Sequence, residues 1–222
     1  MLDHSTVHRR LEYLAGRDPE FTIFGSESHQ YRLGLPLPEK RVAEFEREMG
    51  VELPADYRSF VTTVGNGGAG PGYGLTPLGA AVGAVRREDE GNRRGPRSGR
   101  SSAAQAFPLA SPVLGPEELD GYSGPDFTGV ISLGGYGCGM DPHLVVSGAE
   151  SGHVWILDLA SDGGVYPFAI VETGYLHDEA RGYPSTFEEM AFATRLSFSE
   201  WYEDWLESTE RQLADHVTVR DS

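Results

Sequence analysis

Apolar residues recur at helical spacing in three segments of the N-terminal third of the chain. The first lies within residues 5–15, the next two follow Pro38 and Pro54, and each run stops at a glycine. This spacing lines one face of a helix, and a glycine commonly ends one. We therefore predict three helices, the last two joined by the tight link 50–53 as a helical hairpin or corner. The apolar sets are Val7, Leu11 and Leu14; Val42, Phe45 and Met49; and Tyr57, Phe60, Val61 and Val64.

Short runs of aliphatic and aromatic residues between turn-forming residues predict strands. The glycine-containing stretch 148–152 is the best candidate for a hairpin loop between two of them. Because connections this short join antiparallel neighbours, we predict an antiparallel meander in the second half of the chain. The predicted strands occupy residues 21–24, 31–33, 73–78, 129–133, 143–147 and 152–159.

Two capping boxes predict helix starts near the C-terminus, at Ser185 with Glu188 and at Ser197 with Glu200. In such a box the hydroxyl satisfies a free amide of the first turn and the glutamate reaches back. After the second box, apolar residues cover a broad helix face and acidic residues fill the remainder. We interpret this face as core rather than as a binding groove. It comprises Phe198, Trp201, Tyr202, Trp205, Leu206 and Leu213.

Residues 80–105 interrupt these patterns. They consist largely of Ala, Gly, Ser and Arg and show no apolar period. Such a composition predicts a mobile insertion rather than a linker between domains. We therefore expect residues 1–222 to form one domain.

Length and composition are those of a globular protein: 222 residues, of which 39% are hydrophobic, can bury a sizeable core. No apolar run is long enough to span a bilayer, and the N-terminus does not resemble a secretory signal. The single cysteine, Cys138, cannot close an internal disulfide, which favours a reducing compartment. We expect a cytoplasmic protein that does not bind membranes.

The charge is strongly negative, with a formal net charge of −16. Residues 86–100 are the exception, since six arginines there outnumber three acidic residues. An acidic surface repels nucleic acid and anionic lipid and attracts a basic partner. The simpler alternative is that the acid excess keeps the protein in solution, and charge alone favours that alternative.

Two glycine-rich loops are candidates for chemistry. Residues 65–70 match GxGxxG, but a predicted helix precedes the loop and a proline follows it, so it does not predict a nucleotide site. In residues 134–139, Cys138 could be a nucleophile with His143 or His153 as its base. No neighbouring cation or helix N-terminus is evident to activate the thiol, and we predict a small, packed thiol instead.

A metal site is considered at His4, His8 and Glu12, which share one face of the first predicted helix. Two histidines near a terminus are more often solvated, and no further ligand is evident. The sequence also contains no GxSxG, HExxH or Walker motif. We predict no catalytic residue, cofactor or metal, although a convergent active site would leave no such signature.

A series of short motifs, in a fixed order, runs from about residue 28 to residue 207. Together they resemble the Smi/Knr cell-wall-regulator family of the SUKH superfamily. The first half contains Leu37-Pro38, Glu44-Phe45-Glu46, Leu53-Pro54-x-Asp56-Tyr57-x-x-Phe60 and Val64-Gly65-Asn66-Gly67-Gly68. The second half contains the segments 129–133, 137–139, 144–148 and 152–155, followed by Phe198-x-x-Trp201-Tyr202-x-x-Trp205-Leu206.

This resemblance implies an α+β fold in which helices pack around a central, mostly antiparallel sheet. It also implies a single SUKH-like domain over 1–222, with an N-terminal helical extension (1–27) and the insertion 80–105 outside the common core. The family has no known catalytic activity. Its bacterial members are mostly immunity proteins that bind and silence toxins, and its fungal members are interaction hubs.

The expected function is therefore that of a non-enzymatic, protein-binding immunity protein whose partner is a basic toxin domain. A regulatory scaffold of the same family is the alternative, and an unrecognised enzyme is less favoured. For the contact face we select loop residues that a rigid scaffold could present to a partner, namely Asn66, Tyr73 and Tyr136.

Overall fold

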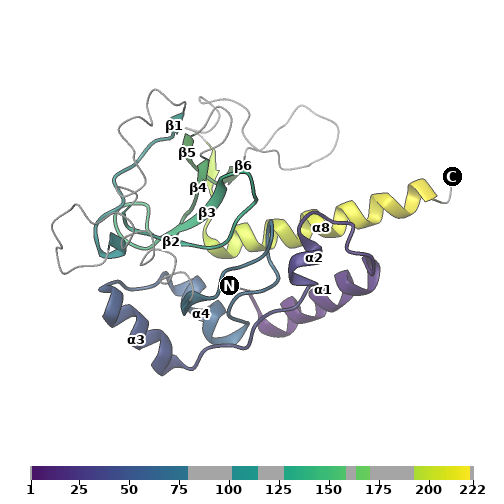
Figure 1. The fold of residues 1–222 in the computed structure, drawn as a ribbon, viewed down its shortest axis with the longest axis horizontal. Helices are drawn as coiled ribbons and strands as arrows, with labels where there is room; N and C mark the ends of the chain where they lie inside the picture. The colour runs from purple at the N-terminus through teal and green to yellow at the C-terminus, as the bar shows by residue number, and fades with distance from the viewer. Residues whose placement is uncertain (1, 80–101, 115–127, 159–163, 171–192, 221–222) are drawn as a thin grey trace.

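The computed structural model describes residues 2–79, 102–114, 128–158, 164–170 and 193–220. Within these ranges a five-stranded antiparallel sheet has helices packed against one face, with the long α8 (Phe198–Arg220) running between the sheet and α1 (His4–Arg17) (Figure 1). The predicted α+β class with an antiparallel sheet is confirmed. The remaining helical elements are α2 (Ser26–His29), α3 (Glu39–Met49), α4 (Ala55–Thr63) and the 3-10 turn η1 (Ser102–Ala104).

The strand order of this sheet is β1-β5-β4-β3-β2. In the central pair, His143 lies opposite Trp155 and Leu144 opposite Val154, which confirms the meander predicted around the 148–152 turn. A separate two-stranded sheet pairs β6 with β7. The strands are β1 (Val113–Leu114), β2 (Val130–Ser132), β3 (Met140–Val145), β4 (Val154–Asp158), β5 (Gly164–Pro167), β6 (Ala169–Ile170) and β7 (Thr194–Arg195).

Successive residues of a strand point to opposite faces of the sheet, and both faces of β3 and β4 are covered. Leu144 and Val154 belong to the main core beneath the helices, whereas Val145 and Trp155 belong to a second cluster on the other face. In that second cluster the ring of Phe107 lies 4.8 Å from the ring of Trp155, centroid to centroid.

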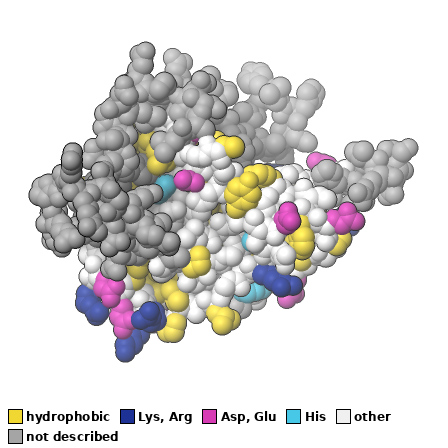
Figure 2. All heavy atoms as spheres, viewed as in Figure 1, with side chains coloured by type: hydrophobic (Ala, Val, Ile, Leu, Met, Phe, Trp, Pro, Cys, Tyr) yellow, Lys and Arg dark blue, Asp and Glu magenta, His cyan; other side chains and the backbone are white. Residues whose placement is uncertain are grey.

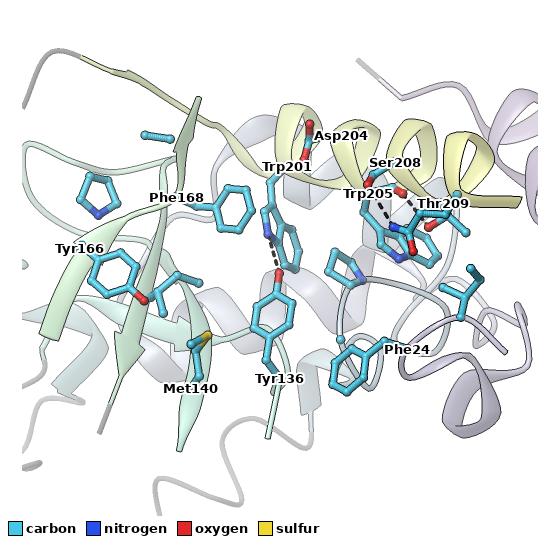
Figure 3. Close-up of a pocket in the computed structure, with 17 residues that line it drawn as sticks. Phe24, Tyr136, Met140, Tyr166, Phe168, Trp201, Asp204, Trp205, Ser208 and Thr209 are labelled. Carbon is cyan, nitrogen blue, oxygen red and sulfur yellow. Dashed lines mark hydrogen bonds between the residues drawn. The ribbon is translucent and has the colours of Figure 1, made fainter. Parts of the chain in front are cut away.

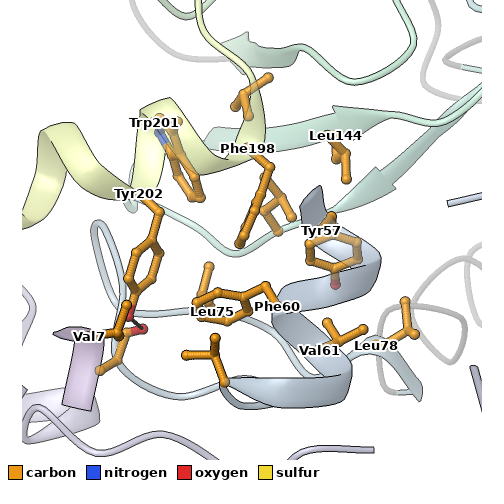
Figure 4. Packing of buried hydrophobic residues seen from close by; sticks show 14 of the residues in the cluster. Val7, Tyr57, Phe60, Val61, Leu75, Leu78, Leu144, Phe198, Trp201 and Tyr202 are labelled. Atoms are coloured by element: carbon orange, nitrogen blue, oxygen red, sulfur yellow. Dashed lines mark hydrogen bonds between the residues drawn. The ribbon is translucent and has the colours of Figure 1, made fainter. Parts of the chain in front are cut away.

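The main core is built on aromatic side chains of α4 and α8 (Figure 4). The Phe198 ring lies 4.8 Å from that of Tyr57 and 5.1 Å from that of Phe60, at steep interplanar angles. Such edge-to-face pairs add to the free energy gained by burial. The capping box of Ser197 and Glu200 is formed, and the core contains Trp201 and Tyr202 as predicted.

Ion pairs hold the N-terminal helix α1 against α8. The Arg10 guanidinium donates to both carboxylate oxygens of Glu210, at 2.7 and 2.9 Å, and also to Glu203. Behind these contacts, Val7, Leu11 and Leu14 are buried on the face that the sequence predicted. The extension is therefore part of the packed structure.

The predicted strands at 21–24, 31–33 and 73–78 are wrong. Leu33, Gly68, Leu75 and Gly134 instead form a chain of isolated bridges, in which Gly68 pairs with both Leu33 and Leu75. A Cβ at Gly68 would lie 2.3 Å from the Arg32 carbonyl oxygen, so only glycine allows this approach.

Residues 21–31 are organised by the buried Asp18 carboxylate rather than by a sheet. It accepts hydrogen bonds from the Thr22 backbone at 2.6 Å and from the Tyr31 hydroxyl at 2.7 Å, and also from Ile23 and Ser26. Burial tends to raise the pKa of Asp18, but the hydrogen bonds from Thr22, Tyr31 and Ile23 outweigh burial and hold that pKa below its ordinary value.

Of the predicted insertion 80–105 the structure describes residues 102–105, in which η1 lies beside β2, Ala103 is buried and Gln105 is exposed. The mobility predicted for 80–101 and the capping box at Ser185 lie outside the described residues. Among the helices that are described, none combines the length and hydropathy needed to cross a membrane.

Candidate functional site

A groove of about 380 Å³ opens between α8 and the strands β4, β5 and β6 (Figure 3). We call it the α8 groove. Its third side is made by two loops that contribute Phe24 and Gly72, and its lower end by Tyr136 and Met140. Its volume lies within the usual range of binding pockets, roughly 300 to 1,000 Å³.

The floor of the α8 groove is aromatic. The Trp201 indole N–H donates to the Tyr136 hydroxyl at 3.3 Å, which fixes both rings, and the Phe168 ring stands 6.5 Å from the Trp201 ring. Burial raises the pKa of Tyr136, and the negative charge of Asp204 adds to that shift. The phenol therefore remains a neutral hydrogen-bonding group at physiological pH.

Trp205 forms part of the α8 wall and is backed by a buried histidine. The rings of His29 and Trp205 meet edge to face at 5.7 Å, and His29 Nδ1 accepts the Tyr31 N–H at 3.0 Å. Burial lowers the pKa of His29 to about 4, so the imidazole is neutral at pH 7 with its proton on Nε2. The neutral ring supports Trp205 from the interior.

The rim carries exposed aromatic side chains. Phe24 is 59% exposed and Tyr73 is 50% exposed, and their rings lie 5.3 Å apart. The Tyr73 amide donates to the Gly135 carbonyl at 3.0 Å, which joins the segment that follows the first glycine-rich loop to the second glycine-rich loop. A Cβ at Gly72 would lie 2.5 Å from that same carbonyl oxygen, so this close contact between the two segments requires glycine at position 72. Large apolar groups held in water by a rigid loop are typical of contact surfaces.

The wall also has a polar row along α8. Asp204, Ser208 and Gln212 follow one another at a spacing of four residues, and Gln212 donates to Ser208 at 3.3 Å. Asp204 is 5% exposed and is the charged member of the groove lining among the described residues. On the far side the Tyr166 hydroxyl is hydrogen-bonded to Asp158, and burial together with that carboxylate raises the pKa of Tyr166.

The structure brings together two of the three predicted contact residues. Tyr136 lines the groove and Tyr73 stands at its rim against Phe24. Asn66 instead serves its own turn, since its side-chain oxygen accepts the Leu78 N–H at 2.8 Å. Whether any of the three touches a partner stays a prediction.

Sequence reasoning missed Phe24, Asp204 and Trp205. Trp205 was assigned to the core, but it is only partly buried and faces the groove. The sequence of α8 did contain a signal for Asp204 and Trp205, because Asp204 has one tryptophan three residues before it and another directly after it. Nothing local marks Phe24, whose place depends on the hydrogen bonds to Asp18.

Of the residues considered for chemistry, Cys138 is exposed and adopts φ 53°, so the prediction of a packed thiol is wrong. His143 places Nδ1 3.0 Å from the Asp141 carbonyl oxygen, and burial lowers its pKa to about 4. His8 is not simply solvated, because Nε2 lies 3.0 Å from the Val64 carbonyl oxygen. Within the described ranges, no cluster of three or more His, Cys, Asp or Glu side chains could hold a metal.

No curated protein matches this sequence. The model of the SMI1 / KNR4 family (SUKH-1), however, matches residues 36–204. That span contains the two helices α3 and α4, the antiparallel sheet and the first turns of α8, and thus most of the groove lining. The match covers well over half of the chain, and the protein therefore belongs to the SMI1 / KNR4 (SUKH-1) family.

Proposed function

We propose that this protein is an immunity protein that binds a cognate toxin domain and neutralises it. Family membership supports this, because bacterial proteins of the SUKH superfamily that the sequence resembles are mostly of this kind. In this proposal the chain acts by binding alone, without catalysis or a cofactor, in the cytoplasm of the cell that it protects.

The α8 groove is the observation that carries a binding function. It is an apolar cavity with exposed aromatic residues at its rim, and its loops are fixed by backbone hydrogen bonds. Aromatic side chains in such settings supply most of the affinity of protein interfaces. We propose that Tyr73 and Tyr136 contact the toxin here, and that Asn66 keeps the neighbouring turn in shape.

Charge supports a basic partner. The formal net charge is −16, and acidic side chains lie along α8 beside a group of hydrophobic side chains on the face shown in Figure 2, whereas basic and acidic residues alternate over α3. Complementary charge raises the rate of encounter and disfavours acidic competitors. Many toxins that attack nucleic acid carry positive surfaces for the same electrostatic reason.

The test is a toxicity-rescue assay with toxins encoded next to this gene. We expect co-expression to protect cells that the toxin alone kills, and the purified proteins to form a complex whose association slows as salt rises. The relevant scale is a Debye length of roughly 8 Å at physiological ionic strength. Failure to protect against any neighbouring toxin, with the protein folded, would instead support a scaffold of the same family.

A further inference from the structure

The segment that joins α2 to α3 has an open backbone edge (Figure 1). The Gly34 N–H donates to the Gly67 carbonyl at 2.9 Å, and the Arg32 carbonyl accepts the Ala69 N–H at 2.7 Å. In an antiparallel bridge of this kind, the residue between the two hydrogen-bonded ones directs its own N–H and C=O to the opposite side. The backbone groups of Leu33 therefore point away from the bridge, towards the outside of the sheet.

Leu35 continues this edge. Pro36 follows it, and a residue before proline is held in an extended conformation. Within the described part of the chain, no hydrogen bond uses the backbone N–H or C=O of Leu33 or Leu35, and the Leu35 side chain is 88% exposed. We call Leu33, Gly34 and Leu35 the 33–35 edge. It offers two donors and two acceptors on a backbone that is already extended.

Unpaired backbone groups of this kind are a template for a further strand, and an apolar cavity lies beside them. The cavity has a volume of about 620 Å³ and is lined by Leu33 itself, by Leu11 of α1 and by Phe21, among others. Side chains that stand directly opposite each other in an antiparallel pair share one face of the sheet. A residue paired with Leu33 therefore places its side chain next to Leu33, at this cavity, and an apolar residue suits that position.

We propose that the 33–35 edge accepts an extended segment of a protein partner as an additional strand, with apolar residues opposite Leu33 and Leu35. The proposal rests on the proposed function only in taking this segment from a protein partner. The formal net charge of −16 favours basic residues at the alternate positions of the segment and opposes pairing of the edge with a second copy of this chain. Because the edge is extended before binding, the cost of ordering falls mainly on the partner segment.

The direct test uses a probe of known composition, the blocked peptide acetyl-Lys-Val-Lys-Val-Lys-amide. With its two valines opposite Leu33 and Leu35, the valine N–H groups point at the edge and the lysine N–H groups point away from it. One control peptide is N-methylated at the backbone nitrogens of both valines, and the other at those of the last two lysines. All three peptides carry the same charge, so they differ only in which backbone donors they retain.

We expect the unmodified peptide to shift the backbone amide resonances of Leu33 and Leu35 saturably in an NMR titration. The lysine-methylated peptide should bind similarly, whereas the valine-methylated peptide should bind about tenfold more weakly or worse, because it lacks the two donors that face the edge. The absence of a saturable shift at these two amides, or equal affinity of the two methylated peptides, would overturn the proposal.

Matched variants locate the contact. Leu35→Pro removes a donor of the edge together with the side chain, whereas Leu35→Ala removes the side chain and keeps the donor. We expect Leu35→Pro to weaken binding of the unmodified peptide severalfold more than Leu35→Ala does. Tyr13→Ser, at a side chain that is 53% exposed and outside the cavity lining, should leave this binding unchanged. Equal losses in Leu35→Pro and Leu35→Ala would mean that only apolar contact is involved and would refute backbone pairing.

A folding defect in Leu35→Pro would show in circular dichroism, and the comparison of the two methylated peptides on the wild-type protein would still decide the question. Analytical ultracentrifugation tests the alternative occupant. A dimer of the wild type that Leu35→Pro abolishes would assign the edge to a second copy of this chain and overturn the proposal.

The rescue assay separates this proposal from the proposed function. If the wild type and a folded Leu35→Pro variant protect cells equally, the strand pairing is wrong and the immunity function stands. If the wild type protects against no toxin while the valine-methylated peptide still binds more weakly than the lysine-methylated one, the edge stands and the immunity function is wrong.

Discussion

Protonation of His29 should link the stability of the groove wall to pH. His29 is 8% exposed, lies against Trp205, and has its pKa lowered by burial to about 4. Its pKa in the unfolded chain is about 6.5, so as pH falls the unfolded state binds the proton first. A depressed histidine pKa therefore contributes stability that is present above about pH 6.5 and lost as pH falls towards 4.

The size of this loss of stability follows from the two pKa values of His29, in the folded and in the unfolded chain. Between about pH 7 and about pH 5 the unfolded histidine becomes almost fully protonated while the folded one stays neutral, which costs about 2 kcal/mol of unfolding free energy. His143, whose pKa is lowered to about 4 as well, contributes a loss of the same sign. The wild type should therefore lose stability steeply over this range.

The variant His29→Asn isolates the first contribution. Asparagine can place its side-chain oxygen near the position of Nδ1 and still accept the Tyr31 N–H, but it does not titrate. Urea unfolding followed by tryptophan fluorescence, at a series of pH values, should give His29→Asn a lower stability near pH 7 and a shallower dependence on pH. His143→Asn should likewise make the dependence of the unfolding free energy on pH shallower.

An unchanged slope in His29→Asn would refute the reasoning, whatever its absolute stability. A second measurement addresses the cause directly, because the imidazole resonances of His29 can be followed in the native protein. We expect them to titrate with a midpoint of about 4. A midpoint near the ordinary value would show that the ring is hydrated and does not support Trp205 as described.

Three further predictions concern single side chains. Tyr202→Phe removes the hydroxyl that donates to the Ala69 carbonyl at 3.0 Å in the core and should cost about 1 to 3 kcal/mol in urea unfolding, whereas Tyr13→Phe, at an exposed ring, should cost almost nothing. Asp18→Ala should lower the unfolding free energy by about 3 kcal/mol or more, because several buried donors lose their acceptor, and a smaller loss would mean that water replaces the carboxylate. Cys138 should react fully with a thiol reagent in the native state, in a single phase; reaction only after unfolding would contradict its exposure.

Elements with strong local signals could be predicted from the sequence. The spacing of Val7, Leu11 and Leu14 identified α1, and Ser197 with Glu200 identified the start of α8, because these signals depend on residues a turn or two apart. The turn 148–152 likewise identified the β3–β4 pair. In each case a local pattern and the tertiary structure agree.

The elements that failed depend on distant partners. The sequence of residues 21–24 is typical of a strand, but the Asp18 carboxylate accepts hydrogen bonds from backbone amides of this segment and holds it as a loop. Leu75 pairs with Gly68 and with Gly134 through single bridges only. The α8 groove has the same origin, since its residues come from six separate stretches of the chain. No periodicity within one stretch can reveal that Phe24 and Trp205 contribute to a common cavity.

The ion pairs between Arg10 and α8 help to show which residues belong to the packed core of this protein. The family match stops at residue 204, partway along α8, and begins after α1, yet Leu206 and Leu213 are buried in the same core as Val7 and Leu11. A fragment trimmed to 36–204 would lose the later turns of α8 and the helix that covers them, and with them Trp205, Ser208 and Gln212 from the groove wall. The span that the family model matches is therefore shorter than the packed core of this chain, and the first helix belongs to that core.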